Sequence, residues 1–239
     1  MGSPVLEHAA RTDTGRRRSR NEDAVRTEPP AGLFVVADGM GGHPAGHVAS
    51  ALAVEEVGDR MLEAEPGEGW EAALRRLSGA VTAAGERILR EGREDPERRG
   101  MGTTCTALLV RPGRWAVANV GDSRAYRLRG GELEQLSVDH TAYPGSSALT
   151  RALGTEREPE PDLFEGELRA GDVYLLCSDG LMHTHPDEEI EAALERAAPG
   201  DDAGDAAGPA AVADRMIEEA NERGAPDNVT VAVVAIREA

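Results

Sequence analysis

Four aspartates lie at the ends of apolar, strand-like runs, and together they could hold a cation. Asp38 closes "FVVAD", Asp122 closes "VANVGD" and Asp179 closes "YLLCSD", whereas Asp227 begins "DNVTVAVV". Antiparallel strands bring the end of one strand and the start of the next to the same edge of a sheet. The four carboxylates could therefore converge on one site, although any single Asp after a strand is also a common turn residue.

Converging carboxylates near buried strand ends repel one another and are costly to desolvate unless a cation holds them. No pair of His or Cys residues stands near the four aspartates in the pattern, so we expect a site made of oxygen ligands alone. Such ligands favour Mg²⁺ or Mn²⁺ over zinc. The sequence therefore predicts a magnesium or manganese site.

The glycines after Asp38 allow a second interpretation. The stretch "LFVVADGMGGHPAG" at residues 33–46 runs from a strand through a glycine-rich turn, an order that can cradle a phosphate on backbone N–H groups. A dinucleotide-binding loop needs G-x-G-x-x-G, and counted from Gly39 and Gly41 the third glycine falls on Pro44. The mismatch favours Asp38 as a metal ligand, with the chain entering a helix near Val48.

Apolar periodicity predicts the elements that must position these residues. A strand is expected at residues 33–37, and two helices follow, the second over residues 70–88. The first helix has one apolar face, formed by Ala51, Val54, Val57 and Met61. Next come four strand-rich segments, "TTCTALLV", "RWAVANV", "RAYRLRGGELEQL" and "DVYLLCS".

Helices are expected to begin near Pro186 and to cover residues 212–220, before a last strand "NVTVAVVAI". Strands grouped in the middle with helices to either side favour an α+β fold with antiparallel sheets. No long Pro/Ser-rich linker divides the 239 residues, so we expect a single domain over residues 1–239. The segment 199–209 is read as a loop or a weak boundary.

Charge and residue usage exclude several function classes. The formal net charge of −18 opposes binding to nucleic acid and to anionic membrane surfaces, so we expect neither as a partner. All 26 basic residues are arginine, which excludes a P-loop lysine, a kinase lysine and a Schiff-base lysine. Arginine remains available, and it is the better bidentate clamp for phosphate.

The chain is expected to be cytoplasmic and to lie outside the membrane. Cys105 and Cys177 each stand inside an apolar strand-like run, which favours two reduced core thiols over a disulfide or a nucleophile. The start "MGSPVLEHAA" has neither the pattern of a signal peptide nor that of a myristoylation site. No apolar run approaches the ~20 residues of a membrane span.

Seven stretches carry the pattern of a known family. They are "TDTGRRRSRNEDA", "VVADGMGGHPAGHVAS", "GMGTTCTALLV", "VANVGDSRAYRLRGGELEQLSVDHT", "LTRALG", "GDVYLLCSDGL" and "APDNVTVAVV". In this order they resemble the metal-dependent serine/threonine protein phosphatases of type 2C, in their bacterial form. The resemblance runs from about Thr12 to Val234 and implies a four-layer α-β-β-α sandwich with a two-metal site at one edge.

The resemblance also implies roles for individual residues. Asp38 bridges two Mn²⁺ or Mg²⁺ ions, and the carbonyl of Gly39 binds one of them. The remaining implied metal ligands are Glu22, Asp23, Asp122, Asp179 and Asp227. Within that set, Glu22 and Asp23 bind directly or through water, and Asp122 and Asp179 hold a weaker third ion.

Arg18 matches the phosphate-binding arginine of the family, and Asp38 and Arg18 are the implied catalytic residues. Arg16, Arg17 and Arg20 crowd Arg18 and are read as a solvated basic patch. Ser178 and Asn228 are candidates for orienting the ligands. Met40 stands where some members have a histidine usable as a general acid, and His43 nearby is read as structural.

One departure concerns the active-site flap of the family. Between "DHT" at residues 139–141 and "LTRALG" at residues 149–154 only "AYPGSSA" remains, so we expect a shortened flap and a more open site. The predicted function is hydrolysis of phosphoserine and phosphothreonine in proteins, opposite a serine/threonine kinase. Two alternatives remain: a phosphatase of a small or biosynthetic phosphoester, and a catalytically weak phospho-binding regulator.

Overall fold

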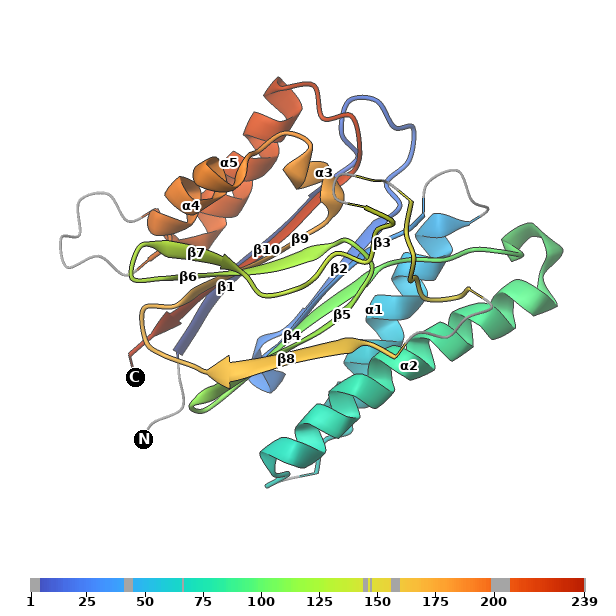
Figure 1. The fold of residues 1–239 in the computed structure, drawn as a ribbon, viewed down its shortest axis with the longest axis horizontal. Helices are drawn as coiled ribbons and strands as arrows, with labels where there is room; N and C mark the ends of the chain where they lie inside the picture. Colours follow the sequence, from blue (N-terminus) through green and yellow to red (C-terminus); the bar gives the residue numbers. More distant parts are fainter. Residues whose placement is uncertain are drawn as a thin grey trace.

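The computed structural model describes residues 5–40, 45–65, 67–143, 146, 148–155, 160–198 and 207–238. In these residues two five-stranded antiparallel sheets pack face to face, and helices cover both outer faces (Figure 1). The predicted α-β-β-α sandwich is thereby confirmed.

Each sheet combines strands that are distant in sequence. The first sheet has the order β1 (Val5–Asp13), β10 (Val229–Arg237), β9 (Val173–Cys177), β6 (Arg124–Arg129) and β7 (Glu132–Gln135). The second sheet has the order β2 (Asp23–Glu28), β3 (Leu33–Asp38), β4 (Cys105–Arg111), β5 (Arg114–Val120) and β8 (Asp162–Glu167). In the second sheet β2 and β3 form one hairpin and β4 and β5 form another, and a long helical connection separates β3 from β4. The first sheet joins the two ends of the chain through β1 and β10.

The helices form the two outer layers. Helices α1 (Gly46–Leu62) and α2 (Trp70–Glu94) pack on the second sheet, and α4 (Asp187–Glu195) and α5 (Gly208–Glu222) pack on the first sheet. A single helical turn, α3 (Asp179–Met182), directly follows β9. Two short 3-10 turns lie at Pro29–Ala31 and Pro96–Arg98.

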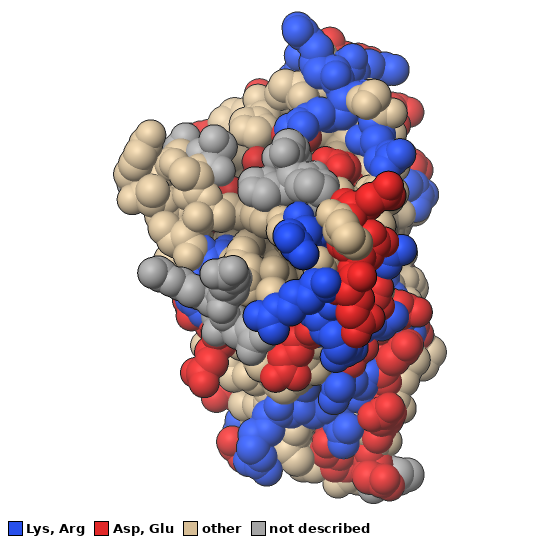
Figure 2. Space-filling model, turned by 90° about the vertical axis from the view of Figure 1, so that its right-hand side faces the viewer, with Lys and Arg blue, Asp and Glu red and all other residues tan. Residues whose placement is uncertain are grey.

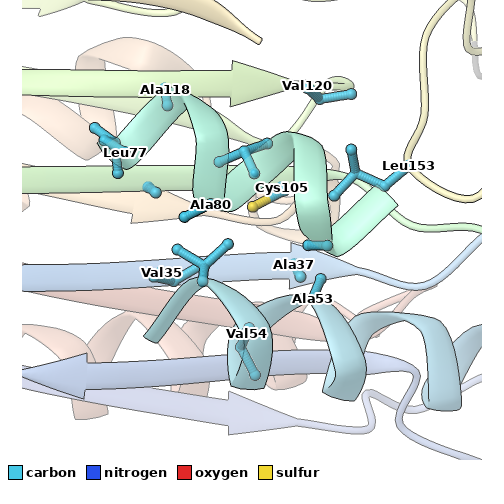
Figure 3. Close-up of a cluster of buried hydrophobic side chains, with 14 of the residues drawn as sticks. Val35, Ala37, Ala53, Val54, Leu77, Ala80, Cys105, Ala118, Val120 and Leu153 are labelled. Atoms are coloured by element: carbon cyan, nitrogen blue, oxygen red, sulfur yellow. The ribbon is translucent and has the colours of Figure 1, made fainter. Parts of the chain in front are cut away.

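Three buried clusters hold the four layers together. The first cluster lies between the second sheet and helices α1 and α2, and it includes Val35 and Leu77 (Figure 3). The second lies between the sheets, because alternation along β3 turns Phe34 away from Val35 and toward Tyr174 on β9. The third joins the first sheet to α4 and α5, for example through Met216. Aliphatic side chains dominate these clusters, as the small aromatic content predicts.

Small residues allow α1 to lie close to the second sheet. Ala49 and Ala53 are fully buried, and Val57 and Met61 continue the same face of α1. The predicted face is wrong in one position, because Ala51 is exposed and Ala53 takes its place. The helix begins at Gly46, two residues before Val48. The error follows from alanine, which occurs on both faces of this helix and carries little periodic signal.

Three strands are absent from the sequence prediction: β1, β2 and β8. Each is the outermost strand of its sheet. The fourth outer strand, β7, was predicted from the turn signal "RGGE" that joins it to β6.

Charged side chains of both signs are interspersed on the face seen from the right-hand side of Figure 1 (Figure 2). Between the two helices of this half of the molecule, Arg87 on α2 binds Glu55 on α1 at 2.8 Å and Glu56 at 3.1 Å. Exposed pairs of this kind contribute about 0–1 kcal/mol each, so core packing supplies most of the stability. Among the described helices, none has the length and apolar character needed to cross a membrane.

Candidate active site

The four aspartates singled out in the sequence meet at one edge of the sandwich. Asp38 ends β3 and Asp122 follows β5, which runs parallel to β3 because β4 lies antiparallel between them. Asp179 follows β9, and Asp227 precedes β10, the antiparallel neighbour of β9. Two carboxylates thus come from each sheet, as the strand-end pattern predicts.

A cleft of about 740 Å³ opens at this edge. Among the residues that line it are Arg18, Glu22, Asp38, Gly39, Asp122, Asp179 and Asp227. Residues 148–152, which begin at the last residue of the short segment read as a reduced flap, form another part of its wall. Of the predicted site residues, only Asp23 is missing from the described lining.

Two threonines hold the backbone of Asp38 in place. The Asp38 N–H donates to Thr104 Oγ1 at 2.9 Å, and the Asp38 carbonyl accepts from Thr103 Oγ1 at 2.8 Å and from the Thr104 N–H at 2.9 Å. Thr104 Oγ1 also lies 2.7 Å from Ser123 Oγ, next to Asp122. These contacts leave the Asp38 side chain as the part of the residue that faces the cleft.

Gly39 occupies a place that has no room for a side chain. A Cβ there would overlap the carbonyl oxygens of Gly46 and Glu22. The Gly39 N–H donates to the Glu22 carbonyl at 3.0 Å, and Gly39 pairs with Thr103 in an isolated β-bridge. The glycine turn therefore brings backbone close to backbone beside Asp38, as the metal interpretation requires.

Asp23 lies behind Asp38 and is held by two hydroxyl groups. It is the cross-strand partner of Asp38, and its Oδ2 accepts hydrogen bonds from Ser178 Oγ at 2.7 Å and Thr230 Oγ1 at 2.6 Å. Burial raises the pKa of Asp23 to about 6, although both hydroxyl groups act in the opposite direction. This geometry favours Asp23 as a supporting carboxylate, and its role as a direct ligand stays a prediction.

Asn228 ties the loop between β1 and β2 to the start of β10. Its Oδ1 accepts from the Glu22 N–H at 2.9 Å, and its Nδ2 donates to the carbonyls of Thr14 at 2.8 Å and Arg20 at 2.9 Å. The Asn228 N–H donates to Asp227 Oδ1 at 2.8 Å. Asn228 thus positions Glu22 and Asp227, the orienting role proposed for it from the sequence.

Arg18 reaches the cleft and pairs with one of its carboxylates. Arg18 Nη2 donates to Asp227 Oδ2 at 2.6 Å, and the Arg18 side chain is 40% exposed. Arg20 has a different contact, since its Nη1 lies 3.1 Å from the ring nitrogens of His47. Among the described arginines of this loop, Arg18 is the one that lines the cleft.

Three carboxyl groups of the cleft have raised pKa values, and a bound cation would stabilise their ionised forms. Burial, with the charges of Asp23 and Asp179 in addition, raises the pKa of Asp38 well above its usual range. Burial and then the charge of Asp179 raise the pKa of Asp122 to about 6. Burial also raises the pKa of Asp179, and Asp227 adds to this effect.

Two buried carboxylate oxygens without a hydrogen-bond partner also favour a bound cation. Oδ1 of Asp23 and Oδ1 of Asp179 are buried and have no hydrogen-bond partner among the described residues. Carboxylates in this state are stabilised by a divalent ion, so the residues present fit the predicted Mn²⁺ or Mg²⁺.

Sequence reasoning missed His183, which lies beside two carboxylates of the cleft. A ring nitrogen of His183 and one carboxylate oxygen each of Asp179 and Asp227 lie within 4.8 Å of one another. The expectation of oxygen ligands alone therefore leaves out a nitrogen atom at this edge. The spacing of four residues from Asp179 was the available signal, but it becomes visible only when a helical turn is known to follow β9. His43 and Pro44 lie outside the described residues, as does most of the loop at 199–209.

Comparison with known proteins gives a consistent result. A sequence profile described as Protein phosphatase 2C matches residues 13–208. The serine/threonine protein phosphatase PstP of Mycobacterium tuberculosis is 40% identical over 249 aligned positions, which cover 97% of this chain and 45% of PstP. The serine/threonine phosphatase stp of Listeria monocytogenes is 34% identical over 94% of this chain and 93% of its own length. The chain thus spans less than half of PstP but nearly all of the Listeria protein.

Solved structures agree in fold. A crystal structure of Mycobacterium tuberculosis PstP superposes with a TM-score of 0.84 at 40% identity, covering 98% of this chain and 100% of that chain. A crystal structure of the PstP catalytic domain in complex with two manganese ions gives a TM-score of 0.84 at 38% identity, with coverage of 99% and 100%.

Proposed function

Because the chain belongs to the protein phosphatase 2C family, we propose that it hydrolyses phosphoserine and phosphothreonine monoesters in proteins, using two Mn²⁺ or Mg²⁺ ions. The observation that carries the proposal is the convergence of Asp38, Asp122, Asp179 and Asp227 with Arg18 in one cleft. We take residues 1–239 to act as one catalytic domain.

The carboxylates and the Gly39 carbonyl are proposed to hold the ions. Asp38 lines the cleft together with Gly39 and the two carboxylates of the first sheet, and it would be the carboxylate that both ions share. When bound, a pair of divalent ions activates water and neutralises charge on phosphoryl oxygens. Thr103, Thr104 and Asn228 keep these ligands in place through the hydrogen bonds described above.

Arg18 is proposed to bind the phosphoryl group of the substrate. Its guanidinium lies at the cleft, where it can donate two parallel hydrogen bonds to phosphate oxygens. In the structure its Nη2 is engaged by Asp227. An ion on Asp227 would compete for that carboxylate and so favour transfer of the guanidinium to an incoming phosphate.

The partners follow from this chemistry. We propose a phosphorylated protein as substrate and an opposing serine/threonine kinase as the source of the phosphoryl groups, in the cytoplasm. The net charge of −18 opposes binding to nucleic acid and to anionic membrane surfaces.

The flap that the sequence predicts to be short favours a second candidate, a phosphatase of small phosphoesters. Thr141 pairs with Leu149 in an isolated bridge, and the Ala142 N–H donates to the Ala148 carbonyl at 3.0 Å, so few residues separate the paired ends. A short segment beside the cleft would leave it accessible to small substrates as well.

The test is release of phosphate from a phosphothreonine peptide by the purified protein with Mn²⁺. We expect Asp38→Asn to lower kcat/KM about a hundredfold or more, because the ions contribute several kcal/mol to such reactions. Asp214→Asn is the matched control, since Asp214 is exposed on α5 and pairs with Arg11 outside the cleft.

Three other outcomes would decide between the candidates. Faster turnover of p-nitrophenyl phosphate than of any phosphopeptide would favour the small-substrate phosphatase. Tight phosphopeptide binding without turnover would favour the phospho-binding regulator. Phosphate release that persists in chelator or in Asp38→Asn would exclude the metal mechanism.

A further inference from the structure

His183 lies beside the two carboxylates that the first sheet contributes to the cleft. It immediately follows α3, and its N–H donates to the Asp179 carbonyl at 3.1 Å, so residues 179 and 183 are one helical turn apart. Residues four apart on a helical turn share a face. This turn explains why a ring nitrogen of His183 and oxygens of Asp179 and Asp227 lie within 4.8 Å of one another.

These separations are close to those of atoms bound to a common ion. Two ligands that each lie about 2.0–2.2 Å from a metal are at most about 4.4 Å apart. Small side-chain rotations would therefore bring all three atoms into one coordination sphere.

The His183 imidazole and the Asp179 carboxylate both have atoms that could bind a metal ion. The His183 imidazole is exposed and makes no hydrogen bond or ion pair with any residue that the structure describes. Asp179 Oδ1 is buried and likewise lacks a hydrogen-bond partner in the described part of the chain. An acceptor buried without a partner is costly unless something else satisfies it.

His183 lines a second cavity that adjoins the main cleft. A second cavity of about 370 Å³ is lined by Asp122, Asp179 and His183 among others, and it shares Asp122 and Asp179 with the main cleft. The imidazole therefore lies beside Asp179 in the second cavity, whereas Arg18 and Glu22 line only the main cleft.

We propose that His183 is a nitrogen ligand of the ion held by Asp179 and Asp227. The proposal rests on the metal site of the proposed function and adds a ligand that the oxygen-only pattern leaves out. Imidazole suits Co²⁺, Zn²⁺ and Fe²⁺ better than Mg²⁺, whereas carboxylates, carbonyls and water suit Mg²⁺. His183 therefore biases this position toward transition metals.

The test is metal binding, measured without substrate. Calorimetric titrations with Co²⁺ and Mg²⁺ would compare the wild-type protein with His183→Ala and His183→Asp. We expect His183→Ala to weaken Co²⁺ binding by about tenfold or more and to change Mg²⁺ binding much less. His183→Asp restores an oxygen ligand and is expected to recover Mg²⁺ binding while the Co²⁺ preference stays lost.

A spectroscopic signal identifies the nitrogen directly. With Mn²⁺ bound, pulsed electron paramagnetic resonance of the wild-type protein should show coupling to an imidazole ¹⁴N nucleus, and both His183 variants should lack it. His8→Ala is the control, since His8 is exposed on β1 and is not among the described residues that line either cavity.

The results separate this proposal from the one it rests on. If the wild-type protein binds neither Mn²⁺ nor Co²⁺, the metal site of the proposed function fails, and this proposal fails with it. If the wild-type protein binds both ions but His183→Ala keeps the same Co²⁺ affinity and the same ¹⁴N coupling, only the assignment of His183 is overturned.

Discussion

The clustered carboxylates at the sheet edge favour binding of a positively charged ion. Sequence reasoning found Asp38, Asp122, Asp179 and Asp227 because strand ends in an antiparallel sheet meet in a predictable way. It could not find the 2.6 Å pair of Arg18 and Asp227, which joins residues 209 positions apart. That contact depends on the path of the loop after β1, and no local pattern encodes such a path.

Titration of these carboxylates should make the metal-free protein less stable as pH rises. Asp122 has a pKa of about 6 in the folded state, against about 3.9 for an unfolded chain. The unfolded state therefore loses this proton first, and the stability present below about pH 4 is lost as pH rises through about 6.

Melting curves in chelator at pH 5 and pH 7.5 would measure this loss. Asp122→Asn removes the titrating group, so the fall in Tm between the two pH values should be smaller in the variant than in the wild-type protein. An equal fall in both proteins would show that Asp122 does not contribute. Added Mn²⁺ should reduce the wild-type fall, because the ion stabilises the ionised carboxylates.

At the scale of the elements, sequence patterns predicted the inner strands and missed three of the outer ones. β3, β5 and β10 are apolar runs buried on both faces, between a second sheet and a helix layer. β8 has the pattern "DLFEGE", with one face exposed, and every residue of β2 is only partly buried. Outer strands commonly carry charges that limit further pairing, so their apolar signal is weak.

The turn from β9 into α3 is the element that sets the distance between Asp179 and Asp227. Gly180 has no room for a side chain, since a Cβ there would overlap the Asn228 carbonyl oxygen. Gly180→Ala should therefore push α3 away from the start of β10, destabilise the protein by about 1–3 kcal/mol and weaken Mn²⁺ binding.

Gly79→Ala is the matched control for this substitution. Gly79 lies within α2, and a Cβ there meets nothing within 4 Å, so the change should stabilise the fold by about 0.5–1 kcal/mol. Denaturant unfolding and metal titration of both variants would measure the contrast. Unchanged Mn²⁺ affinity in Gly180→Ala would show that the turn does not control the carboxylate spacing.

At the scale of the whole molecule, the two sheets share the site between them. The second sheet supplies Asp38 and Asp122, and the first sheet supplies Asp179 and Asp227. The family and the four-layer fold predicted from seven ordered motifs are both confirmed. The motifs succeeded because each surrounds a strand end or turn at this shared edge, whereas the outer strands lie outside most of them.

Ions at a shared edge should stabilise the molecule as a whole. A ligand at a hundredfold excess over its Kd stabilises the folded state by about 2.7 kcal/mol. We therefore expect calorimetry to show one unfolding transition whose Tm rises with Mn²⁺ concentration. Asp38→Asn should lose most of that rise, and Asp214→Asn should keep it. A second transition that appears on chelation would mean that the sheets unfold separately.

Alkylation of the two cysteines would measure the opening of each half of the sandwich separately. Cys105 lies in β4 of the second sheet and Cys177 in β9 of the first, and both are fully buried. Burial raises the pKa of each thiol to about 12. Neither thiol therefore reacts with alkylating reagents while it stays buried in the folded protein. Mass spectrometry of a slowly alkylated sample would show which thiol is modified first. The order and rate of labelling would then reveal whether transient openings expose one half of the molecule or both halves together.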